Sequence, residues 1–200
     1  MDSLQRTAGM AALVAAVGGI LYGYFFVVVG NVAVASALLM LGGLLMTLII
    51  VVLGSSVEEV NRPLARWAVG VGFVGALLSV IHAGYDLANQ IHPPGPSAGD
   101  FPNPADPRGL ATFGLTGIAV LILGGLMSRS ARYPRGLARA GQALGAIMVV
   151  IYLGRLIILD PNNPVVQVAL ALGVIANTVF LFWVGRHWLG RAASRERPAG

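Results

Sequence analysis

The sequence predicts an all-α membrane protein, a polytopic bundle of six transmembrane helices in one domain over residues 1–200. Only 10% of the side chains are charged and 56% are hydrophobic, whereas soluble proteins carry about 25% charged residues. The hydrophobic residues form continuous runs of roughly 20, the length of helix that crosses a hydrocarbon core. Because the runs lack the alternation of a β-barrel, helices are the structure that satisfies their backbone groups in lipid.

Polar and proline-rich stretches divide these runs into six helices. Gly30 and Asn31 form a turn between the first two helices, and the polar stretch GSSVEEVNR ends the second. The segments HPPGPSAGDFPNPADPR, SRSARYPRG and DPNNP separate the others. The predicted helices cover residues 7–29, 32–53, 63–90, 109–127, 137–159 and 164–185, and a short tail follows over residues 186–200.

The arginines predict the orientation in the membrane. If the N-terminus is inside, the outer loops hold only Arg108, and the inner side holds eleven arginines: Arg6, Arg62, Arg66, Arg129, Arg132, Arg135, Arg139, Arg186, Arg191, Arg195 and Arg197. By the positive-inside rule, both termini are cytoplasmic, and we expect the protein in the cell (inner) membrane. Four aromatic residues then fall at the inner interface as an expected aromatic belt: Trp67, Tyr133, Trp183 and Trp188.

Composition excludes several kinds of chemistry. The chain has no cysteine, which removes disulfides and thiolate metal sites, and no lysine, which removes Schiff-base cofactors. The net charge of +5 is explained by orientation and anionic lipid, so nucleic acid is not a predicted partner. No recognisable catalytic motif is present, and no catalytic residue is predicted.

A weak internal repeat suggests three helical hairpins. The first, third and fifth helices begin with LQR at Leu4, LAR at Leu64 and LAR at Leu137. Eighteen residues after each leucine stand Tyr22, His82 and Arg155. The alternative is that leucines beside positive-inside arginines match by chance.

An arginine inside the apolar run VVIYLGRLIILDP requires a charged partner or contact with water. The insertion of a charge near the centre of a spanning helix costs about 2.5–3.5 kcal/mol of free energy. Arg155 lies five residues from Asp160 at the end of its helix, and Asp86 lies six residues from His92 at the end of the third helix. The two charges therefore share a depth. We expect a structural ion pair between Asp86 and Arg155, across a contact of the third and fifth helices. Asp160 is the alternative partner.

The same layer predicts a polar pocket that faces outward. One side of the third helix carries small and polar residues, and the fifth helix adds a tyrosine and an arginine. The candidate ligand-binding residues are His82, Asp86, Asn89, Tyr152 and Arg155. The histidine and the carboxylate lie one turn apart and could form a proton relay or a ligand site; the alternative is a buried histidine bonded to a neighbouring helix.

No metal site or cofactor is predicted. A zinc site would need His92 to bend back toward His82 and Asp86. A haem held by two histidines would need a second histidine at the depth of His82, and haem bound by His82 with a methionine is a remote alternative.

At YLGRLIILDPNNPVV and HAGYDLANQIHPP the chain resembles uncharacterised small multi-pass membrane proteins of bacteria, of the domain-of-unknown-function type. The resemblance covers the third to the sixth predicted helices. It implies a six-helix bundle and no particular activity.

Two classes of function remain open. The first is an integral membrane protein that binds or transports a small ligand, with an anion favoured because Arg155 offers a forked set of donors. The second is a non-catalytic structural or assembly subunit of a larger membrane complex, in which the polar layer is only a clamp. The partners expected are the lipid bilayer, a small anionic ligand and other membrane subunits.

Overall fold

The computed structural model describes residues 2–93, 107–158, 160 and 163–195. Its helices are α1 (Asp2–Gly23), continued by the π-helix η1 (Tyr24–Val29), then α2 (Val32–Ser56), α3 (Arg62–Ile91), α4 (Pro107–Met127), α5 (Arg135–Ile157) and α6 (Pro164–Arg195). Six of these segments are long and apolar enough to span a membrane. The predicted all-α, six-helix fold is confirmed.

The structure differs from the predicted helices mainly at three places. Helix α1 begins at Asp2, five residues before the predicted start at residue 7. The segment Tyr24–Val29 is π-helical rather than α-helical. Helix α6 continues to Arg195, so most of the predicted tail over residues 186–200 extends the last helix. Residues 196–200 of that tail, and residue 159 of the fifth predicted helix, lie outside the described residues.

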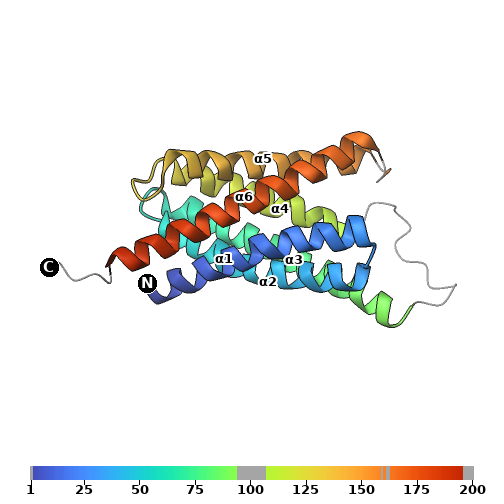
Figure 1. Ribbon diagram of the computed structural model, residues 1–200. Coiled ribbons are helices and arrows are strands. Elements are labelled where there is room, and N and C mark those ends of the chain that lie inside the picture. The colour runs from blue at the N-terminus through green and yellow to red at the C-terminus, as the bar shows by residue number, and fades with distance from the viewer. Residues whose placement is uncertain (1, 94–106, 159, 161–162, 196–200) are drawn as a thin grey trace.

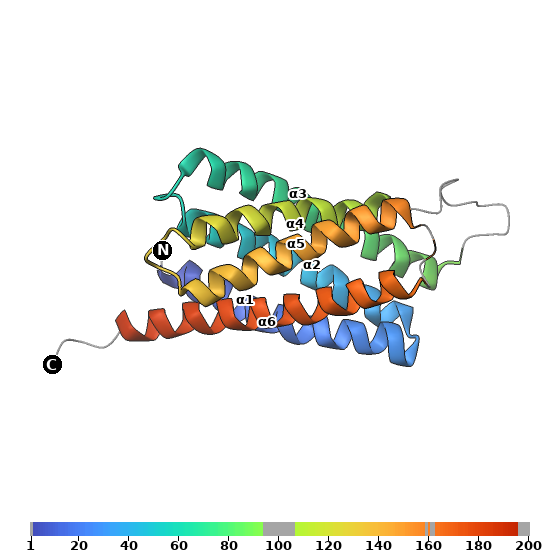
Figure 2. The same ribbon diagram turned by 90° about the horizontal axis from the view of Figure 1, so that it is seen from above.

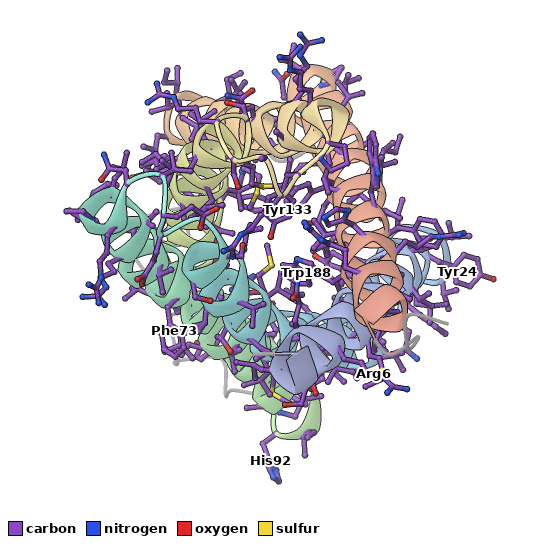
Figure 3. The ribbon with its side chains drawn as sticks, turned by 90° about the vertical axis from the view of Figure 1, so that its left-hand side faces the viewer. Arg6, Tyr24, Phe73, His92, Tyr133 and Trp188 are labelled. Atoms are coloured by element: carbon purple, nitrogen blue, oxygen red, sulfur yellow. The ribbon has the colours of Figure 1, made fainter. Side chains whose placement is uncertain are left out.

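The helices form a closed ring in the order of the chain, seen from two sides in Figures 1 and 2 and end-on in Figure 3. Each long helix packs against its neighbours in sequence, and α1 packs against α6. Within the described residues the backbones of α3 and α5 make no contact, because α4 packs between them. The expected contact of the third and fifth helices is therefore wrong.

Asparagine side chains mark where three of the helices begin. The side chain of Asn31 accepts a hydrogen bond from Val34 N (3.0 Å), and that of Asn61 accepts one from Leu64 N (3.1 Å). Asn163 in the same way accepts from Val165 N at 3.0 Å. Each bond satisfies a backbone donor that lacks a partner within its own helix, so these short polar turns fix the helix starts.

Glycines let several neighbouring helices approach closely. A Cβ atom on Gly145 of α5 would lie 2.7 Å from the carbonyl oxygen of Gly117 on α4. One on Gly43 of α2 would lie 2.9 Å from the carbonyl oxygen of Ala76 on α3. One on Gly185 of α6 would lie 2.8 Å from the carbonyl oxygen of Gly9 on α1. The α4–α5, α2–α3 and α6–α1 contacts therefore depend on the absence of a side chain at these glycines.

The two ends of the ring differ. Both termini lie at one end (Figure 1), which we call the arginine-rich end. Its described arginines are Arg6, Arg62, Arg66, Arg129, Arg132, Arg135, Arg139, Arg186, Arg191 and Arg195. The connected hydrophobic core fills this half of the ring, with members such as Leu53, Met127, Leu137 and Phe180. The predicted polar layer lies in the other half, toward the opposite end, and so lies outside this core.

Candidate functional site

Two of the five predicted site residues form a pair on α3. His82 Nε2 lies 3.5 Å from Asp86 Oδ2, and the two side chains are 25% and 34% exposed. Their spacing of four residues places them on the same face of the helix. Asn89 follows one turn further along and is half-buried.

Helix α4 packs against the histidine of this pair. The start of α4 packs on the imidazole, because a Cβ atom on Gly109 would lie only 3.2 Å from His82 Nε2. The absence of a side chain at Gly109 thus lets the histidine ring lie directly against the α4 backbone.

The other two predicted residues lie on α5 and have separate surroundings. The ring of Tyr152 packs against α4, where a Cβ atom on Gly114 would lie 3.0 Å from its Cγ. Arg155 donates from a terminal guanidinium nitrogen to the carbonyl oxygen of Ile158, at 3.4 Å. An arginine in the last turn commonly bonds to the last carbonyl groups of its helix and complements the helix dipole.

The structure therefore divides the predicted site into an α3 part and an α5 part, with α4 between them. Figure 1 shows α3 and α5 ending on different sides of the bundle. The described residues show no ion pair between Asp86 and Arg155, so this pair stays a prediction.

A second polar group, which sequence reasoning missed, lies at the arginine-rich end. Trp188 Nε1 donates to the Tyr133 hydroxyl oxygen (3.0 Å), which lies 2.6 Å from Ser56 Oγ. Ser56 Oγ also donates to the carbonyl oxygen of Leu53 at 2.6 Å. A hydroxyl has one hydrogen to donate, so Tyr133 must donate to Ser56. The result is a directed chain from α6 through the α4–α5 loop to α2.

This chain, which we call the Ser56–Tyr133–Trp188 network, lies inside the ring. Figure 3 shows Tyr133 and Trp188 within the circle of helices and Phe73 on its outer side. Burial raises the pKa of Tyr133 above its usual value near 10, so its hydroxyl stays neutral at physiological pH. The neutral hydroxyl can then donate and accept at the same time.

Charged residues surround the network and join the loops. Glu59 accepts from Arg132 Nε (3.3 Å) and from Ser130 Oγ (2.9 Å). The backbone carbonyl of Arg132 is bonded to His187 Nε2 at 3.1 Å and to Arg191 of α6. The α2–α3 linker, the α4–α5 loop and α6 are thereby tied together at one end.

The expected aromatic belt is only half correct. Trp67 and Trp183 are 54% and 40% exposed, as interfacial residues should be, but Tyr133 and Trp188 are 7% and 0% exposed. Their prediction as belt residues is wrong. The spacing of residues in the sequence does not distinguish an inward aromatic residue from an outward one at the same depth. For Trp183 and Trp188 the difference depends on which side of α6 points into the ring.

No family model, curated protein or solved structure matches the chain. The resemblance to small bacterial membrane proteins therefore remains a proposal.

Proposed function

We propose that the protein is an integral membrane protein that binds a small ligand in the polar layer near the opposite end of the ring. The observation that supports this most is the His82–Asp86 pair, which lies within the span Arg62–Ile91 while each side chain stays partly exposed.

Ionisable side chains within a span rarely face lipid, because the cost of the exposed charge is high. A partly exposed pair there is better explained by contact with water or a bound solute. The opposite half of the ring also lies outside the connected hydrophobic core. At the arginine-rich end, by contrast, the core and the Ser56–Tyr133–Trp188 network fill the interior. This difference favours binding from one side over passage through the ring.

The proposed ligand is a small anion. Arg155 carries a permanent charge at this depth, and His82 adds a second when it is protonated. A ligand between the α3 and α5 parts would have to reach around α4, so each part is tested separately.

Small anions should raise the thermal stability of the purified protein in detergent. A ligand that binds only the folded state stabilises it by about 2.7 kcal/mol at a hundredfold excess over Kd. We expect a saturable rise in Tm with at least one of phosphate, acetate and succinate at constant ionic strength. His82→Gln should remove the rise if the α3 part binds, because it removes the positive group of that part, and Arg155→Gln should remove it if the α5 part binds.

Arg66→Gln is the matched control, because it removes a positive charge at the arginine-rich end and should leave the rise intact. If no anion shifts the Tm, or if the shift persists in both site variants, the ligand-binding proposal fails.

A structural or assembly subunit is the second candidate. It is favoured by the bond from Arg155 to Ile158, which is a helix-capping contact within α5 and needs no ligand. This function predicts no anion-dependent shift and a lower Tm for Arg155→Gln even without added anions.

We also propose that both termini are cytoplasmic and that the protein lies in a bacterial inner membrane, on the basis of the arginine asymmetry. Because the chain has no cysteine, single cysteines can test the orientation cleanly. A membrane-impermeant maleimide should label His92→Cys in intact cells, and should label Ser128→Cys only after the cells are opened. The reverse pattern would overturn the orientation.

A further inference from the structure

The arginine-rich end contains arginines that pair with carboxylates of the protein. Glu58 pairs with Arg62 (3.3 Å) and Arg66 (3.2 Å), and Glu59 pairs with Arg132 (3.3 Å). Both carboxylates are therefore already engaged by arginines.

Two other arginines have no such partner. Arg135 and Arg139 are exposed at the start of α5, and neither has an ion pair or hydrogen bond with any described residue. Residues four apart lie side by side on a helix, where like charges repel each other. An anion that contacts both side chains would relieve this repulsion.

A tryptophan stands beside these arginines. Trp183 of α6 is 40% exposed and packs against α5 at Gly136, where a Cβ atom would lie 2.8 Å from Trp183 Cη2. Tryptophans that remain exposed at the end of a span sit at the level of the lipid headgroups. The two arginines and the indole therefore lie where a lipid phosphate is expected.

We propose that Arg135, Arg139 and Trp183 form a binding site for the headgroup of an anionic phospholipid. Guanidinium groups bind phosphate through two parallel hydrogen bonds, and basic sites at the ends of transmembrane helices bind acidic headgroups. We assign a lipid rather than a soluble anion because the exposed Trp183 packs at Gly136, next to Arg135, and exposed tryptophans at the end of a span lie at the level of the headgroups. It is independent of the proposed ligand site, which lies near the other end of the ring.

Quenching of tryptophan fluorescence by brominated lipids tests the proposal. In a Trp67→Phe background, Trp183 is the accessible tryptophan and the fully buried Trp188 supplies a constant signal. The protein is reconstituted with brominated phosphatidylglycerol or brominated phosphatidylcholine at equal mole fraction. Each arginine near an anionic surface contributes about a fivefold preference, so we expect phosphatidylglycerol to be favoured at least fivefold at low salt.

The double variant Arg135→Gln/Arg139→Gln should reduce this preference to near one. The matched control Arg62→Gln/Arg66→Gln removes the same charge from arginines that are already paired with Glu58, and should retain the preference. Equal quenching by the two lipids in the parent protein would overturn the proposal. So would an equal loss in both double variants, which would show a general charge effect, or a parent preference that free inorganic phosphate abolishes, which would show a soluble-anion site.

Discussion

Replacement of Trp188 by alanine should lower the free energy of unfolding by about 3–5 kcal/mol, the range for truncating a fully buried tryptophan. The indole is 0% exposed and its N–H bonds to Tyr133. Trp188→Ala therefore removes a large packed side chain and also leaves the Tyr133 hydroxyl without its donor. The effect can be measured by circular dichroism during titration of the detergent-solubilised protein with a denaturing detergent.

Two variants separate packing from hydrogen bonding. Tyr133→Phe keeps the ring and removes the hydroxyl, which leaves the buried Trp188 N–H unsatisfied, and should cost about 1–3 kcal/mol. Trp67→Ala truncates an indole that is 54% exposed and should have a much smaller effect. Equal losses for Trp188→Ala and Trp67→Ala would contradict the inward position of Trp188.

The number and approximate limits of the helices could be predicted because they depend on local properties. Each span is a run of apolar residues at least as long as the bilayer requires, and asparagines at positions 31, 61 and 163 precede helix starts. Depth along a helix could also be counted from its end, which is how His82, Asp86 and Arg155 were assigned to one layer. These quantities need no knowledge of neighbouring helices.

The side of each helix that points into the ring could not be predicted. Asp86 and Arg155 have similar depths, but the order of the ring places α4 between their helices. Trp188 and Trp183 are five residues apart at the same end of α6, yet one is buried and the other is 40% exposed. Every helix carries apolar residues on all sides, so hydrophobic periodicity does not distinguish the ring interior from lipid.

For the same reason the sequence does not show which glycines lie against a neighbouring helix. Gly145→Ala should destabilise the protein by about 1–3 kcal/mol or more, the cost of overpacking a tight contact. The new Cβ would meet the backbone nitrogen of Leu121 and lie 2.7 Å from both Leu121 Cα and the carbonyl oxygen of Gly117. Backbone atoms cannot move aside by changing rotamer, so α4 and α5 would have to separate.

Gly154→Ala is the matched control on the same helix. A Cβ atom there would have no neighbour within 4 Å, and alanine favours a helix over glycine by about 0.8–1.0 kcal/mol. The same chemical change should therefore lower the Tm at Gly145 and leave it unchanged or raise it at Gly154. Because both substitutions alter helix propensity alike, the difference between them isolates the contact between α4 and α5. Similar effects at the two positions would mean that these helices do not pack through Gly117 and Gly145.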